Sequence, residues 1–104
     1  YMAIADASKG MSDTSGDIQL SENKCGIVYA SIFGEDCNVT RIEPAIVGGP
    51  YDAGESAYVC NEDNIANPDN ILLLNDGRLI IGEDSNYHEQ NMGWIWDPSA
   101  EIIS

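Results

Sequence analysis

Residues 60–70 concentrate oxygen-bearing side chains directly before a short apolar run. Seven of them carry a carboxylate or an amide: Asn61, Glu62, Asp63, Asn64, Asn67, Asp69 and Asn70. The apolar run leads to Asp76-Gly77, which favours a tight hairpin turn, and the chain then returns through residues 79–81 to Glu83 and Asp84. If the two arms pair, both acidic groups meet at one end of the hairpin. Such oxygens suit calcium or magnesium, so a cation site is one interpretation. A merely polar loop is the other.

The composition limits the classes of partner. The chain has 104 residues, enough for one small domain with a modest core. It carries 18 acidic against 4 basic residues, a formal net charge of −14. Nucleic acid and anionic membrane surfaces would repel such a chain. No apolar run approaches the roughly 18 residues that a membrane-spanning helix needs. We therefore expect no nucleic-acid partner and no membrane insertion.

The first residue and the cysteines favour an extracytoplasmic location, whether periplasmic, secreted or at the cell surface. The chain starts at Tyr1 and no basic-then-apolar leader follows, so we expect a processed product or a piece of something longer. Cys25, Cys37 and Cys60 lack the spacing of a zinc site. Their odd number permits one disulfide with one free thiol, or no disulfide at all.

Short β-rich runs separated by turns predict an all-β fold of antiparallel hairpins. Helical periodicity is nearly absent, because Gly, Pro, Asn and Asp interrupt the chain too often. The expected strands cover residues 26–33, 39–42, 45–47, 71–74, 78–82, 92–97 and a last strand from 101. Pro44 should mark a sheet edge or a bulge. Trp94 and Trp96 should share one strand face and serve in packing.

This order of elements is typical of roughly one and a half blades of a β-propeller. Residues 1–22 would be irregular or hold a remnant inner strand, residues 23–50 would form the outer hairpin of one blade, and residues 60–104 the next blade with its acidic metal loops. Closed propellers have about four to eight blades. Partial blades expose strand edges and apolar faces, so we expect the remainder of the same propeller, or other chains of an assembly, to complete the domain.

Several phrases in consistent order resemble the PhoX family of bacterial alkaline phosphatases. They are GDIQLSENKCGIVYA (16–30), VTRIEPAIVGGPY (39–51), CNEDNIANPDNILLL (60–74) and LIIGEDSNYHEQNMGWIWD (79–97). Members of that family are larger than this chain. The resemblance implies the later part of a β-propeller built around a cluster of calcium and ferric iron (Ca²⁺ and Fe³⁺). It further implies hydrolysis of phosphate monoesters outside the cytoplasm.

The resemblance also ranks the candidate site residues. The matches at residues 67–70 and 82–84 are the best place for metal ligands, with Glu83 first. The other candidates follow in this order: Asp69, Asn70, Asp84, Asp63 and Asn64. His88, the only histidine, is a weak catalytic candidate, since a histidine in such a loop is more often a hydrogen-bonding surface residue. A structural thiol or a disulfide is expected for Cys25 and Cys60, in preference to an iron ligand.

The chemistry that the resemblance implies is metal-ion catalysis. Bound cations would neutralise the phosphate oxygens and activate an oxygen nucleophile, while the carboxylates position the metal. An incomplete ligand set would leave the isolated chain with little or no activity. One alternative is a non-catalytic calcium-binding segment of a structural or cell-surface propeller. A second is a calcium-dependent lactone or ester hydrolase on a similar propeller.

Overall fold

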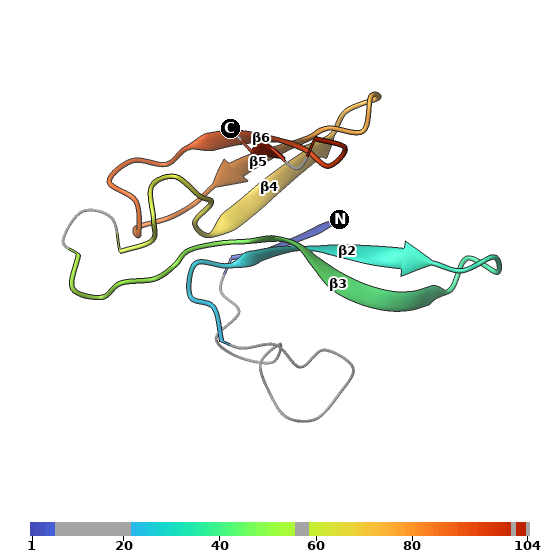
Figure 1. Cartoon of the computed structure of the whole chain (residues 1–104), viewed down its shortest axis with the longest axis horizontal. Helices are drawn as coiled ribbons and strands as arrows, with labels where there is room; N and C mark the ends of the chain where they lie inside the picture. The colour runs from blue at the N-terminus through green and yellow to red at the C-terminus, as the bar shows by residue number, and fades with distance from the viewer. Residues whose placement is uncertain (6–21, 56–58, 101, 104) are drawn as a thin grey trace.

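The computed structural model describes residues 1–5, 22–55, 59–100 and 102–103, and these form antiparallel β-structure with no helix among them. One sheet contains β1 (Met2–Ile4), β2 (Ile27–Phe33) and β3 (Val39–Val47). The other contains β4 (Pro68–Leu73), β5 (Leu79–Glu83), β6 (Gly93–Asp97) and β7 (Ile102–Ile103). In both sheets the spatial order follows the chain order (Figure 1). The all-β prediction is therefore confirmed. Within the described residues there is also no helix of the length and apolarity that crossing a membrane requires.

Most expected strands are present within one residue of their expected bounds, with two larger differences. The return strand of the first hairpin is one continuous strand, because the register shift near Pro44 absorbs the proline without ending β3. As predicted, Pro44 lies on an edge strand. The strand β4 starts at Pro68 instead of residue 71, because a register shift between Pro68 and Asn70 lets the residues before Ile71 join the sheet. Of the expected N-terminal region, residues 6–21 lie outside the described part, as does residue 101.

Both hairpins turn at sites that the sequence marks. Gly77 has φ +91°, which the Asp-Gly turn requires, and the N–H of Leu74 donates to the carbonyl of Arg78 at 2.8 Å. The carboxylate of Asp76 accepts from the backbone N–H of Arg78, and this hydrogen bond lowers the pKa of Asp76. At the other tip, the side-chain amide of Asn38 lowers the pKa of Asp36 in the same way. These exposed acids stabilise turns.

The main core lies between the two sheets. Val28 and Ile46 from the first sheet pack with Leu79, Ile81 and Trp94 from the second, and Ile65 completes the cluster. Trp96 packs against the same cluster, so the expected packing role of both tryptophans is confirmed. The strands β1 and β4 also lie against each other where the sheets meet (Figure 1).

The second sheet exposes apolar side chains on its outer face. Leu72 pairs with Ile80, and Ile80 pairs with Ile95, so the three form a row across β4, β5 and β6. Their exposed fractions are 60%, 36% and 42%. A row of this kind is typical of a face that another surface covers.

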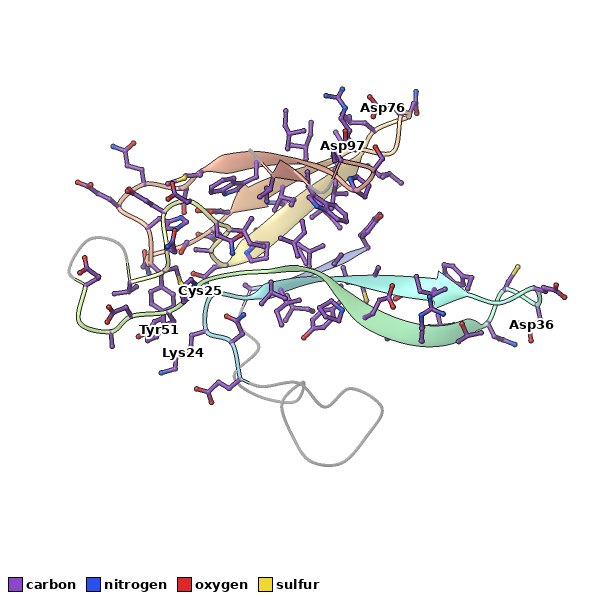
Figure 2. All side chains as sticks on the ribbon, viewed as in Figure 1. Lys24, Cys25, Asp36, Tyr51, Asp76 and Asp97 are labelled. Atoms are coloured by element: carbon purple, nitrogen blue, oxygen red, sulfur yellow. A yellow bond between two sulfur atoms is a disulfide. The ribbon has the colours of Figure 1, made fainter. Side chains whose placement is uncertain are left out.

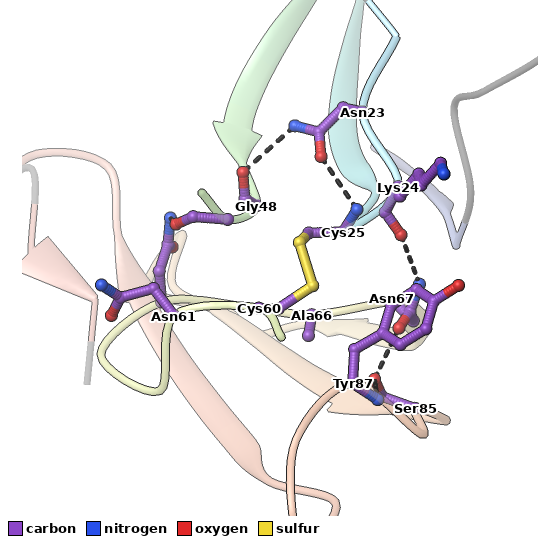
Figure 3. Close-up of a disulfide and its surroundings, with 12 residues drawn as sticks. Asn23, Lys24, Cys25, Gly48, Cys60, Asn61, Ala66, Asn67, Ser85 and Tyr87 are labelled. Carbon is purple, nitrogen blue, oxygen red and sulfur yellow. Dashed lines mark hydrogen bonds between the residues drawn. A yellow bond between two sulfur atoms is a disulfide. The ribbon is translucent and has the colours of Figure 1, made fainter. Parts of the chain in front are cut away.

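A disulfide joins the two sheets at one end. Cys25 precedes β2 and Cys60 lies in the segment that leads to β4; their sulfur atoms are bonded and both residues are fully buried (Figure 3). Cys37 is an exposed free thiol at the tip of the first hairpin. The structure thus selects one disulfide and one free thiol from the possibilities that the cysteine count allows.

Candidate functional site

The second hairpin brings the two acidic groups to one end of the sheet, as the Asp-Gly turn predicts. Pro68 pairs with Glu83, and the N–H of Asp84 donates to the carbonyl of Asn67 at 3.2 Å. Asp69 and Asp84 therefore flank the same paired end of β4 and β5. This shared end is the candidate site.

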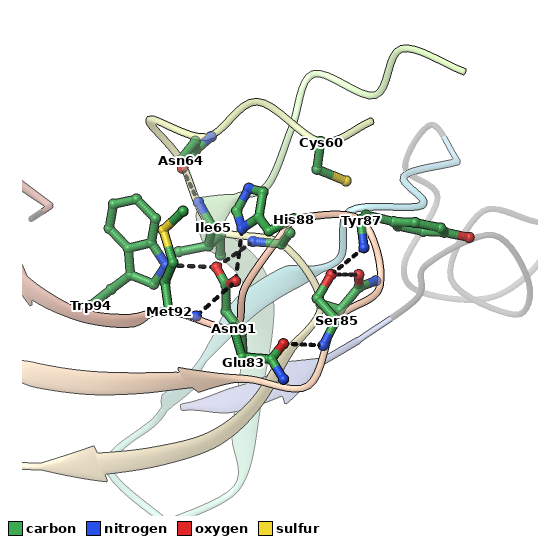
Figure 4. A network of polar contacts seen from close by, with 12 residues as sticks. Cys60, Asn64, Ile65, Glu83, Ser85, Tyr87, His88, Asn91, Met92 and Trp94 are labelled. Atoms are coloured by element: carbon green, nitrogen blue, oxygen red, sulfur yellow. Dashed lines mark hydrogen bonds and ion pairs between the residues drawn. The ribbon is translucent and has the colours of Figure 1, made fainter. Parts of the chain in front are cut away.

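Glu83 is buried there, and its carboxylate is fully hydrogen-bonded (Figure 4). The oxygen Oε1 accepts from Nδ1 of His88 at 2.7 Å and from the backbone N–H of Met92 at 3.3 Å. The oxygen Oε2 accepts from the indole N–H of Trp94 at 2.6 Å and from the backbone N–H of Ala66 at 3.1 Å. Because a carboxylate oxygen accepts about two hydrogen bonds, coordination of a cation by Glu83 would require the loss of at least one of these donors.

His88 is buried against Glu83, which places it in the interior and not on the surface. Its Nδ1 contacts the carboxylate of Glu83 and its Nε2 contacts the carbonyl of Asn61 at 2.9 Å. Both ring nitrogens therefore have a hydrogen-bond partner in the protein. A general base needs a free ring nitrogen, and this geometry leaves none. His88 instead ties the loop after Cys60 to the end of β5.

Asn67 connects the two sheets at the candidate site (Figure 3). Its side-chain N–H groups donate to the carbonyls of Ala5 at 2.6 Å and Lys24 at 2.9 Å, and its backbone N–H donates to the carbonyl of Cys25 at 2.7 Å. The hydroxyl of Ser85 donates to its Oδ1. The residue adopts φ +46°, a conformation that Asn tolerates better than most residues. In the sequence it was one amide among several, and only the fold reveals this role.

Replacing Asn67 with Ala is expected to lower the free energy of unfolding by about 2–3 kcal/mol, because two partly buried carbonyl groups and the buried hydroxyl of Ser85 lose their partner. Urea denaturation of the oxidised chain measures the change. Asn86→Ala is the matched control. Asn86 lines the same depression as Asn67 but is exposed, so its replacement should leave stability unchanged. Equal effects of the two substitutions would contradict the role given to Asn67.

Two further candidates lie in the loop between Cys60 and β4. The amide of Asn64 donates to the carbonyls of Val47 and Gly49, at 2.8 and 2.9 Å, and its Oδ1 accepts from the N–H of Ile65. Asn64 therefore shapes the loop. Asp63 is exposed, and its N–H donates to the side chain of Asn61. This hydrogen bond does not involve the carboxylate of Asp63.

The remaining candidates are exposed at the shared end. Asp69 accepts a hydrogen bond from the side-chain amide of Asn70 at 3.0 Å, and both side chains are exposed. Asp84 lines a shallow depression of about 210 Å³ together with Asn67, Asn86 and Tyr87. Asp69 and Asp84 are thus the carboxylates that could receive a cation without loss of a buried network.

The described residues do not by themselves make a complete site for calcium and iron. Within them, no group of three or more His, Cys, Asp or Glu side chains is placed to hold a metal ion. Cys25 and Cys60 are bonded to each other, so neither offers the thiolate that iron binds. Asp69, Asn70 and Asp84 suit calcium as partial donors, because their oxygens are hard and exposed.

Comparison of the chain with protein-family models, with curated proteins and with solved structures finds no match.

Proposed function

We propose that this chain is part of an extracytoplasmic, calcium-dependent phosphatase of the PhoX type, in which other polypeptide completes a β-propeller. The complete protein would hydrolyse phosphate monoesters. The observation that carries the proposal is the pairing of Pro68 with Glu83, which gathers Asp69 and Asp84 at one end of a sheet. The phrases that resemble the family, including residues 60–74 and 79–97, include this end.

Three further features are consistent with a propeller. The second sheet has four antiparallel strands in chain order, which is the arrangement of a propeller blade. Its first strand, β4, lies against β1, the first strand of the other sheet, as the inner strands of adjacent blades do. The row of Leu72, Ile80 and Ile95 offers an apolar face to a further blade. The disulfide is compatible with an oxidising compartment.

In this proposal the residues of the shared end have two different tasks. Asp69, Asn70 and Asp84 would supply calcium ligands, and the polypeptide that completes the propeller would supply the ligands of ferric iron. Glu83 and His88 hold the end of β5 against the loop after Cys60 and so fix the position of Asp84. Calcium, when bound, would supply positive charge that neutralises the oxygens of a phosphate ester.

Calcium titration of the oxidised chain, followed by amide chemical shifts in NMR spectra, tests the metal part of the proposal. Shifts are expected at residues 69–70 and 84, with dissociation constants of about 0.1–1 mM, as for weak extracellular sites. Asp69→Asn and Asp84→Asn should each weaken binding. Asp36→Asn removes an exposed carboxylate at the far hairpin tip and serves as the control. Calcium-dependent shifts that remain unchanged in both Asp69→Asn and Asp84→Asn would contradict the proposal.

A non-catalytic calcium-binding segment is the second candidate. It is favoured by the use of Asn64 and Asn67 in holding loops together. Turnover of p-nitrophenyl phosphate by the complete protein separates the two candidate functions. A phosphatase must turn the ester over and lose that activity when calcium is chelated. A structural segment should bind calcium without turnover.

A further inference from the structure

A cavity of about 380 Å³ lies beside the disulfide. Its lining residues are Glu22, Asn23, Lys24, Gly48, Pro50 and Tyr51. The ammonium group of Lys24 lies over the ring of Tyr51, 5.2 Å from the ring centre. An aromatic face holds a cation in place without neutralising its charge. The cavity therefore presents a positioned positive charge on a strongly acidic chain.

Lys24 differs from the other described lysine and arginine side chains. Arg41 is paired with Glu43 at 3.0 Å, and Arg78 is paired with Asp76 at 2.8 Å. Within the described part of the chain, Lys24 has no such ion pair. Figure 2 shows Lys24 and Tyr51 together, at the opposite end of the molecule from Asp36 and Asp76 at the hairpin tips.

Lys24 is also connected to the candidate site. Asn67 accepts the N–H of Asp84 on its carbonyl and donates its side-chain N–H to the carbonyl of Lys24. The ring of Tyr51 meets the ring of Tyr87 edge-on at 5.4 Å, and Tyr87 lines the depression of Asp84. The main chains of Lys24 and Asp84 thus bond to the same residue, whereas the ammonium group of Lys24 lies in the cavity of Tyr51 and Asp84 lines the depression of Tyr87.

We infer that Lys24, held over Tyr51, is an anion-binding residue and that its cavity receives the phosphoryl group of the substrate. The identity of the substrate rests on the proposed function, whereas the anion site rests on the cavity and on Lys24. An ammonium group offers three N–H donors to phosphate oxygens. Glu22, which lines the same cavity, opposes an anion by charge repulsion. It therefore lowers the affinity of the cavity for an anion.

Titration of inorganic phosphate into the oxidised chain, with and without calcium, tests the inference by NMR shifts of the amides near residue 24 and of the Lys24 side-chain nitrogen. Lys24→Gln is expected to weaken phosphate binding about tenfold, the loss of one charge-assisted hydrogen bond. Lys24→Arg should retain binding, and Glu22→Gln should strengthen it. Arg78→Gln, which makes the same change in net charge far from the cavity, should have little effect.

Several outcomes would overturn the inference: no phosphate-dependent shift near residue 24 in either condition, unchanged affinity in Lys24→Gln, or equal losses in Lys24→Gln and Arg78→Gln. The spectra of each variant without phosphate report whether it is folded. Phosphate binding at Lys24 in a protein that hydrolyses no ester would support the anion site and refute the proposed function. If the complete protein hydrolyses the ester and its Lys24→Gln variant keeps full activity and an unchanged KM, the proposed function is supported and the anion site is refuted.

Discussion

Replacing Glu83 with Gln is expected to lower the free energy of unfolding by about 3–5 kcal/mol, because one carboxylate oxygen becomes an NH₂ group and two buried N–H donors lose their acceptor, each at a cost of about 1–3 kcal/mol. Glutamine has nearly the same shape, but its side-chain NH₂ would face N–H donors that now point at a carboxylate oxygen. The side chains of Glu83 and His88 have no exposed surface, so water cannot replace the lost acceptor. Since small domains are stable by only about 5–15 kcal/mol, the variant should lose a large share of its stability.

Urea denaturation followed by tryptophan fluorescence measures this effect, since Trp94 donates directly to Glu83. Asp84→Asn is the matched control: it removes the neighbouring carboxylate, which is exposed, and should change stability by less than about 1 kcal/mol. His88→Gln and the double variant complete a thermodynamic cycle that isolates the coupling between the two side chains. A Glu83→Gln variant as stable as the original chain would show that Glu83 is not held as described and would restore it as a candidate metal ligand.

The hairpin at Asp76-Gly77 could be predicted because turn chemistry and strand pairing are local properties of a sequence. Asp-Gly fixes a tight turn, and the pairing of the arms then follows, which placed Asp69 and Asp84 at one end in advance. The bulge that lets Pro68 enter the sheet could not be predicted in the same way, because a register shift depends on how the neighbouring strand pairs.

The difference between a ligand and a buried hydrogen-bond acceptor could not be predicted at Glu83. Composition says only that an acidic side chain lies near other oxygens. Whether its lone pairs remain free depends on donors at Ala66, Met92 and Trp94, which come from two separate segments, one before β4 and one at the start of β6. Similarly, Asn67 could be recognised as one oxygen among many, but its contacts with Ala5 and Lys24 span long stretches of chain. Long-range polar contacts of this kind leave no periodic pattern in a sequence.

Removing the disulfide with Cys25→Ala and Cys60→Ala is expected to cost about 4 kcal/mol. The two cysteines are 35 residues apart, and the loop-closure entropy of a chain of that length gives roughly this value. The link also joins the segment before β2 to the loop that carries Asn61, so its loss should loosen the contact between His88 and the carbonyl of Asn61. Denaturation of the double variant, and of the original chain under reducing conditions, measures the cost.

Cys37→Ser is the control for this experiment, because Cys37 is an exposed free thiol at the far hairpin tip and its replacement should leave stability unchanged. The double alanine variant and the reduced chain should agree within about 1 kcal/mol, since both open the same loop. If neither loses stability, the link adds nothing that packing of the two sheets does not already supply. If both lose about 4 kcal/mol, the chain depends on an oxidising compartment to hold Asn61, Asn67 and Asp84 in place. Calcium binding at Asp69 and Asp84 should then weaken under reducing conditions, so the redox state of one bond would govern the geometry of the shared end.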